Sequence, residues 1–210
     1  MNLRNMLSCI LTLGGCAQMV DSSHNQVHSL IRERHSARAM SGEKISTDEL
    51  MTLFKAAGLA QSSYNDQPWR FIYAERETPH WQPMLDLLVP FNQSWAAKGA
   101  VLIAVISHNN FEHNNQFSRT HSFDTGAAME NLALQGISMG FIVHGMAGFD
   151  YDKARTVLNV PDDYTVEAMF VVGKPGNVKD LPAELQSHEK RSERKDVKDL
   201  ISEGTFKIKK

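Results

Sequence analysis

An unbroken apolar run, Ala100-Val101-Leu102-Ile103-Ala104-Val105-Ile106, constrains the fold more than any other segment of this chain. Seven consecutive apolar residues between polar neighbours are typical of a β-strand that is buried on both faces. Such a strand lies inside a sheet, and other elements must cover both sides of that sheet. We therefore expect a central sheet with helices packed round it.

The clearest helix start lies at Ser46-Thr47-Asp48-Glu49, a capping box in which the first and last residues bond to each other's backbone. Ile45 and Leu50 are placed as the hydrophobic staple that accompanies such a cap. Apolar residues then recur at helical spacing and give the helix one apolar face. They are Leu50, Leu53, Phe54 and Ala57.

A second helix is predicted over Thr125 to Met139, ended near Gly140. Its apolar residues lie on nearly every side, so we expect it at the centre of the fold or in a subunit interface.

Together, the helices and strands that the sequence predicts indicate an α+β domain. The shorter ones are helices at residues 27–34 and from Thr78-Pro79 to Pro90, and strands at residues 71–74, 141–143 and 168–172.

The composition is that of an ordinary globular domain. The 210 residues are 42% apolar and 22% charged, which allows a substantial core. A formal net charge of -2 does not indicate a basic surface that would bind nucleic acid. No apolar run in the sequence approaches the roughly 20 residues that a membrane-spanning helix needs.

Residues 1–18 form a segment with two readings. A short apolar stretch ends at Leu13-Gly14-Gly15-Cys16, as in a bacterial lipoprotein leader whose cysteine is lipidated, and Cys16 would then anchor the protein to a membrane. Alternatively, Met19 is the true start, and residues 19–210 are a single cytoplasmic domain. Both cysteines lie in the first segment, so the domain itself needs no disulfide and uses no thiol.

The tail, residues 177–210, is highly charged and has few apolar residues before Leu200. It cannot form a core of its own, so it is either a solvated tail or an arm that packs on a second subunit. The strand-forming sequence Thr205-Phe206-Lys207-Ile208 favours an ordered arm.

The connection Ser62-Ser63-Tyr64-Asn65-Asp66-Gln67-Pro68-Trp69 crowds hydroxyls, amides and a Pro-Trp step between a helix and a strand. Such a loop offers many hydrogen-bonding groups and little bulk, which suits a flat ligand with polar edges. The order of residues resembles the Pro-Ser-Ser-x-Asn-x-Gln-Pro-Trp signature of the nitroreductase family. Gln61 stands where that signature begins with proline.

Further segments follow in the order that this family shows. Arg34-His35-Ser36-Ala37-Arg38-Ala39-Met40 is similar to its Arg-x-Ser-x-Lys/Arg element, with Met40 where an aromatic residue is common. Residues 124–136 resemble its central helix, and Gly148-Phe149-Asp150 comes after it. Ala147 replaces an acidic residue that some members carry. The resemblance covers nearly the whole chain.

The resemblance implies a fold, a cofactor and a reaction. The fold is a nitroreductase-like, mostly antiparallel sheet surrounded by helices, with a C-terminal arm over the partner subunit of a homodimer. FMN is the implied cofactor, and hydride passes from NADH or NADPH to a nitroaromatic, quinone or similar acceptor by a ping-pong mechanism. Because the flavin carries the reaction, we expect no catalytic acid–base pair among the side chains.

The resemblance also assigns residues to the parts of FMN. The phosphate needs cations and donors, and the ring needs a cation beside it when reduced. At the phosphate end it places Arg34, Ser36 and Arg194, with His35 and Lys195 beside them in the sequence. The ring cation is Arg38. The partners of the ring edges are Ser62, Ser63, Asn65, Gln67 and Asn92, with the backbone of Met146, Ala147 and Gly148.

Several alternatives stay open at this point. Trp69 is either a core anchor or a cofactor contact, and Asn92 either reaches the ring edge or caps a backbone group. His108, His113 and His121 lack a recognised metal-ligand spacing, so we expect a polar loop and no metal site. The alternative functions are a flavin-binding or flavin-storage protein and a related flavin enzyme, dehalogenase-like or flavin-consuming.

Overall fold

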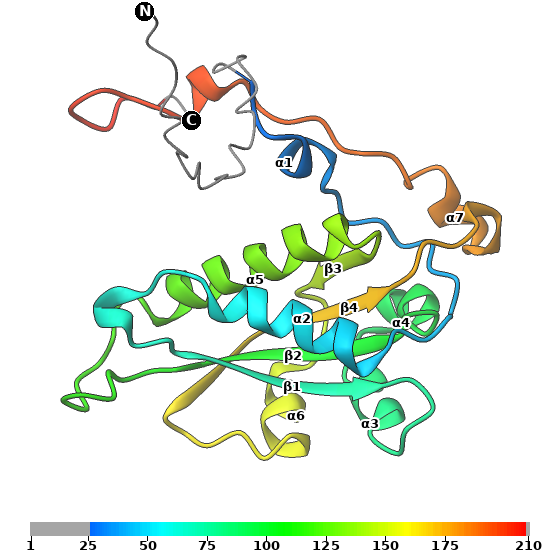
Figure 1. The fold of residues 1–210 in the computed structure, drawn as a ribbon, viewed down its shortest axis with the longest axis horizontal. Helices are drawn as coiled ribbons and strands as arrows, with labels where there is room; N and C mark the ends of the chain where they lie inside the picture. The colour runs from blue at the N-terminus through cyan, green and yellow to red at the C-terminus, as the bar shows by residue number, and fades with distance from the viewer. Residues whose placement is uncertain (1–25, 209–210) are drawn as a thin grey trace, which may run out of the picture.

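The computed structural model describes residues 26–208, so the two readings of residues 1–18 and of Cys16 lie outside it. Four strands form one sheet in the order β1-β2-β4-β3, with helices on both faces (Figure 1). Every neighbouring pair of strands is antiparallel, which confirms the expected α+β fold. The strands are β1 (Trp69–Glu75), β2 (Val101–His108), β3 (Ile142–Met146) and β4 (Tyr164–Gly173).

The strand β2 is buried on both faces, as its apolar sequence predicts. It pairs with β1 on one side and with β4 on the other. Alternate side chains of a strand point to opposite faces. The odd-numbered residues from 101 to 105 therefore enter one apolar cluster, and the even-numbered residues from 102 to 106 enter another. This strand joins the two halves of the core.

Helices form a layer on each side of the sheet. One layer consists of α2 (Thr47–Gly58) and α5 (His121–Ser138), which share a cluster with the odd-numbered β2 side chains. The other layer contains α3 (Trp81–Leu85), α4 (Pro90–Ala96) and α6 (Tyr151–Val157). Among residues 26–208, no helix combines the length and apolar character that crossing a membrane requires.

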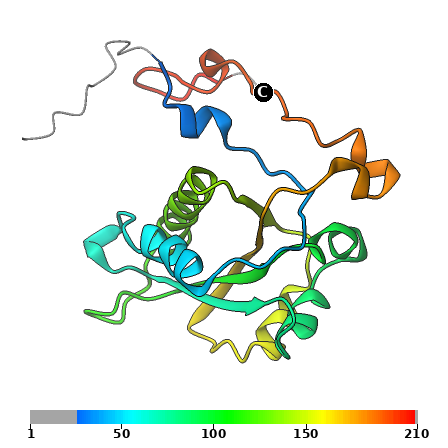
Figure 2. The ribbon, with the colours of Figure 1, turned by 45° about the vertical axis from the view of Figure 1, so that its right-hand side comes forward.

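The two ends of the described chain lie together outside these layers. The helix α1 (Ser29–Glu33) sits over α5, and the chain after α7 (Ala183–Gln186) runs back alongside α1 (Figures 1 and 2). The remaining short elements are η1 (Ser63–Asn65), η2 (Val178–Asp180) and η3 (Val197–Asp199). Residues 191–207, called the arm below, are exposed throughout.

The helix α2 begins as predicted. The Ser46 hydroxyl accepts a hydrogen bond of 3.2 Å from the Glu49 amide, and the Glu49 carboxylate accepts one of 2.7 Å from the Ser46 amide. Ile45 and Leu50 are both buried in the same apolar cluster, in agreement with the staple. Two otherwise unpaired amides of the helix start are thereby satisfied.

The helix α5 begins at His121, four residues before the predicted start, and ends at Ser138 with Met139 as its C-cap, near Gly140 as expected. Gly140 has φ +78, and its amide and that of the next residue donate to carbonyls of the last turn. Within one chain α5 is not buried all round, contrary to the simplest reading of its sequence. Its outer face leaves Phe123, Gly126 and Glu130 exposed.

The helix predicted from Thr78-Pro79 to Pro90 is present only as α3, so both of its predicted ends are wrong. Pro90 does not end a helix but is the first residue of α4. Proline suits that position because the first helical residue needs no N–H, and Val89 before it is extended. Residues 205–208 form no strand, because a strand needs a partner and none reaches them in the described part of the chain.

The packing of α5 on β3 predicts that alanine substitutions at two glycines have different effects on the free energy of unfolding. A Cβ on Gly136 would lie 2.4 Å from Cγ2 of Val143, whereas a Cβ on Gly58 at the end of α2 would meet nothing within 4 Å. We expect Gly136→Ala to lower the free energy of unfolding by about 1–2 kcal/mol, because overpacking outweighs the gain in helix propensity. Gly58→Ala should leave it unchanged or raise it by up to about 1 kcal/mol. Urea unfolding of both variants tests this, and equal effects would contradict the packing.

Candidate functional site

The loop between α1 and α2 carries the Arg34–Met40 element. It starts with a backbone hydrogen bond of 3.0 Å from the Arg34 amide to Leu30, and Met40 forms a β-bridge with Pro175. On the way, Nε of Arg34 lies 3.5 Å from Oε1 of Glu130 on α5. The loop therefore runs from α1 past α5 to the chain that leaves β4.

A cavity of 480 Å³ lies between this loop and the chain after α7. His35, Ser36 and His144 are among its lining residues, and no acidic side chain is. Five cations converge on one space, which suits an anion such as a phosphate. They are Arg34, Arg38, Lys190, Arg191 and Arg194. We call this space the basic cavity.

Of the two predicted residues Arg194 and Lys195, the structure places one at the basic cavity. Arg194 lines the basic cavity, and within residues 26–208 its guanidinium forms hydrogen bonds only to Ser192. Lys195 is exposed and is not among the residues that line this cavity. Of the two, only Arg194 is positioned to meet an anion in the single chain.

A second, more apolar cavity of 340 Å³ adjoins the first, since Arg34 and Ser36 line both. Its floor is the sheet, where Gly145 on β3 lies beside Phe170 on β4. A Cβ at position 145 would come within 2.9 Å of two atoms of the Phe170 ring, so any side chain there would displace that ring. We call this space the slot. One side of α5 forms its wall, and the carboxylates of Glu130 and Glu167 also line it.

Asn92 on α4 is tied to the chain that follows β3. Its Nδ2 donates a hydrogen bond of 3.0 Å to the carbonyl of Gly148, which also accepts from the amide of Val89 at 3.0 Å. Of the two readings of Asn92, the structure therefore shows the backbone contact. That contact falls on the segment 146–148 that the resemblance places at the ring edge, with Met146 buried and Ala147 exposed.

The loop from Ser62 to Gln67 has an unusual backbone. Tyr64, Asn65 and Gln67 have φ values of 54, 56 and 51, a region that residues other than glycine rarely adopt. The Ser63 amide donates to the buried carboxylate of Asp124 at 3.0 Å, and the Gln67 amide donates to the Ser62 hydroxyl at 3.0 Å. Clustered backbone strain of this kind is typical of binding sites.

The loop and the basic cavity are separate within one chain. In residues 26–208, no hydrogen bond or ion pair joins the segment 62–67 to the residues 34–38. Trp69, just after the loop, is buried in the core beneath α2 and α5, so it is a core anchor. The side chains of Asn65 and Gln67 face solvent instead of the basic cavity.

Three buried residues were not predicted: His144, which lines the basic cavity, and Trp95 and Glu189, which lie behind its lining. Trp95 is buried, and its ring centroid lies 4.4 Å from that of His144. The side chain of Glu189 is also buried, and it accepts hydrogen bonds from the backbone of the Arg34–Met40 loop. A single glutamate in a charged tail and a single histidine in a strand carry no pattern that sequence reading could have detected.

The three histidines that were considered for a metal site have different partners. His108 lies 3.4 Å from Asp163, His113 lies against Tyr64, and Nδ1 of His121 lies 2.7 Å from the Ser107 hydroxyl. In residues 26–208, no three metal-ligating side chains come together. The Ser107 hydroxyl also donates to Glu167 on β4, at 2.5 Å, and so joins α5 to the sheet beside the slot.

The comparison with known proteins identifies a shared family. The model of the nitroreductase family matches residues 31–80 and 79–174. A crystal structure of an oxidoreductase containing FMN is 37% identical, superposes with a TM-score of 0.84, and is aligned over 89% of this chain and 96% of its own.

Two sequence relatives match this chain over different lengths. A protein of Archaeoglobus fulgidus, named provisionally as an NADH dehydrogenase/NAD(P)H nitroreductase, is 25% identical over 72% of this chain and 87% of its own length. Protein DrgA of Synechocystis is 35% identical over 30% of this chain. That alignment spans only 29% of the length of DrgA.

The burial of His144 predicts how stability responds to acid. Burial lowers the pKa of His144, and nearby Arg38 lowers it further, while the hydrogen bond to the Ala37 carbonyl opposes the shift. Below about pH 6.5 the unfolded chain therefore gains a proton before the folded chain does, so the free energy of unfolding falls as the pH drops toward the native pKa. Above about pH 6.5 the group contributes no slope.

The variant His144→Gln can still donate to Ala37 but does not titrate. We expect it to lose less stability than the wild type between about pH 8 and about pH 5, measured by urea unfolding of the flavin-free protein. Equal losses in the two proteins would show that His144 does not account for the acid sensitivity.

Proposed function

Since this chain belongs to the nitroreductase family, we propose that it is an FMN-dependent oxidoreductase. It passes hydride from NADH or NADPH to a nitroaromatic, quinone or similar small-molecule acceptor. The observation that carries this proposal is the pairing of the basic cavity with the more apolar slot, which share Arg34 and Ser36. FMN has the same two-part character, a dianionic phosphate and a flat ring.

The residues present fit this cofactor. Arg34, Ser36 and Arg194 would hold the phosphate through charge-assisted hydrogen bonds, with His35 beside them. Arg38 lines the basic cavity and is not among the residues that line the slot. Its ring role follows from the resemblance, and its guanidinium, which makes no hydrogen bond within residues 26–208, would be available as the cation beside the ring. FMN, when bound, supplies the hydride transfer, and the chain supplies orientation and a shielded space.

We further propose that the working unit is a homodimer whose site is shared. The strained loop with Ser62, Ser63, Asn65 and Gln67 is separate from the basic cavity of its own chain, so a second chain would bring it there. The outer face of α5 is open, and the arm has exposed apolar side chains that a partner could cover. These are Val197, Leu200, Ile201 and Phe206.

Stopped-flow mixing with NADH separates the proposal from its alternatives. Rapid bleaching of the flavin, followed by reoxidation with a quinone or nitroaromatic, supports the oxidoreductase. A flavin that NADH and NADPH leave oxidised would favour storage. We place the reaction in the cytoplasm, where these donors are found, and fractionation of a Cys16→Ala variant tests the lipoprotein reading.

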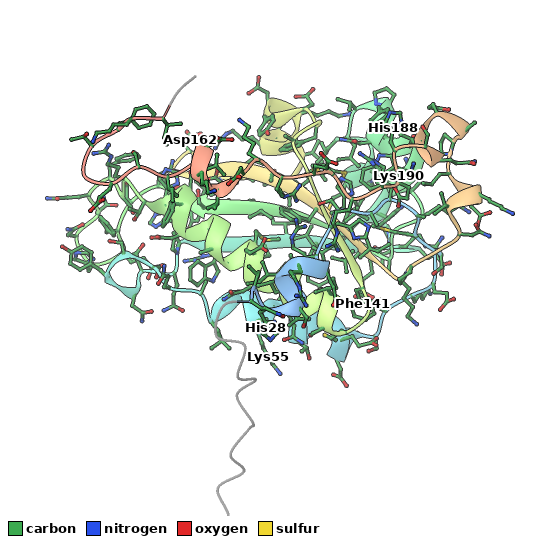
Figure 3. All side chains as sticks on the ribbon, turned by 90° about the horizontal axis from the view of Figure 1, so that it is seen from above. His28, Lys55, Phe141, Asp162, His188 and Lys190 are labelled. Atoms are coloured by element: carbon green, nitrogen blue, oxygen red, sulfur yellow. The ribbon has the colours of Figure 1, made fainter. Side chains whose placement is uncertain are left out.

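The phosphate assignment predicts that Arg34→Ala weakens FMN binding by about 2 kcal/mol, roughly 30-fold in Kd. The reason is the loss of a charge-assisted contact in the basic cavity. Quenching of flavin fluorescence on titration measures this. Lys55→Ala is the control, because Lys55 is an exposed cation on α2 (Figure 3) and its loss removes the same charge elsewhere. An Arg34→Ala protein that binds FMN like the wild type would overturn the assignment.

The shared site predicts a link between assembly and flavin. Phe123 is 73% exposed on the open face of α5, and Phe123→Glu should weaken the dimer by about 1–2 kcal/mol, roughly tenfold. FMN affinity should fall with it by mass action. Sedimentation velocity measures assembly, and Val157→Glu on α6, in the opposite helix layer, is the control. Monomers that bind FMN normally would contradict the shared site.

A further inference from the structure

A buried carboxylate from the chain after α7 reaches into the arginine loop. Oε1 of Glu189 accepts hydrogen bonds from the backbone amides of Arg38 at 2.5 Å and Ala39 at 2.8 Å. Only 6% of its side chain is exposed. Figure 3 shows the neighbours His188 and Lys190 at the end of the molecule where the chain leaves α7. Burying a carboxylate is costly unless donors or a cation compensate it.

The other oxygen of Glu189 faces the side chain of the same arginine. Oε2 lies 3.8 Å from Nη1 of Arg38, which is too far for a hydrogen bond but close enough for strong attraction. Within residues 26–208, Oε2 and Nε of Arg38 are buried without hydrogen-bond partners. The guanidinium also lies over Trp95, with Cζ 5.8 Å from the ring centroid. Arg38 is therefore held in place while its donors remain unused.

We propose that Glu189 is a positioning residue for Arg38, and that it reduces the positive charge which Arg38 presents to the flavin ring. The inference rests on the proposed function, because it concerns the same site. A cation beside the ring stabilises the negative charge of the reduced flavin and raises the reduction potential. A carboxylate beside that cation cancels part of its field. Glu189 thus sets the potential below the value that Arg38 alone would give.

Two substitutions of Glu189 separate the effect of its negative charge from the effect of its hydrogen bonds to the arginine loop. Glu189→Gln keeps an oxygen that can accept from both amides but removes the negative charge. Glu189→Ala removes both, so the chain after α7 loses its contact with the loop. Trypsin should then cleave after Lys190, Arg191 and Arg194 faster in the Ala variant than in the Gln variant or the wild type, and the Ala variant should bind FMN about tenfold more weakly.

The decisive measurement is the reduction potential of the FMN-loaded protein, by dye-equilibrated titration. Glu189→Gln should shift the reduction equilibrium about tenfold toward reduced flavin, a rise of about 30 mV for a two-electron couple. Glu184→Gln, an exposed glutamate on α7, should leave the potential unchanged. A residue that acted only through structure would lower FMN affinity without raising the potential.

A double-mutant cycle shows whether the effect passes through Arg38. Arg38→Met should lower the potential, and Glu189→Gln in that background should shift it much less than in the wild type. An unchanged or lowered potential in Glu189→Gln overturns the inference while the flavin assignment stands. An equal rise in both backgrounds assigns the charge effect to Glu189 directly and also overturns it. A wild type that takes up no FMN overturns the proposed function itself.

Discussion

Burial of β2 on both faces is the constraint on which the rest of this structure depends. Side chains that leave the strand in both directions require a helix layer on each side of the sheet, and the chain supplies α2 with α5 on one side and α3, α4 and α6 on the other. The other three strands are placed around β2. This leaves β3 at the edge, so Gly145 stays exposed at the floor of the slot.

The electrostatics of the candidate site depend on charges close to it. The whole chain is nearly neutral, yet five cations converge on one cavity. Two carboxylates lie beside that group, Glu130 next to Arg34 and Glu189 next to Arg38. Each arginine of the element thus has its own counter-charge, and the more buried carboxylate belongs to the arginine that we place at the ring. The site would be tuned by these pairs and not by net charge.

The strained backbone of the Ser62–Gln67 loop and the exposed surfaces of α5 and the arm both favour the homodimer that we propose. The Ser62–Gln67 loop holds three residues in the left-handed region. The side chains of Asn65 and Gln67 on this loop are exposed in the single chain. The outer face of α5 and the arm are both exposed in the single chain. In the homodimer that we propose, one association would cover these surfaces and complete the site.

The sequence by itself determined what depends on near neighbours. The capping box of α2, the end of α5 just before Gly140 and the strand character of β2 arise within a few residues, so local hydrogen bonds and side-chain alternation decide them. The motif with Arg34 and Ser36 was also readable, since its order is local.

The tertiary structure alone decided the contacts between distant segments. It placed Glu189 against Arg38, which is 151 residues earlier, and Asn92 against the carbonyl of Gly148. It also made Pro90 the start of a helix, because a proline permits either role and the packing of α4 selects one. A buried carboxylate has no sequence pattern of its own, since its stability depends on which donors the fold brings to it.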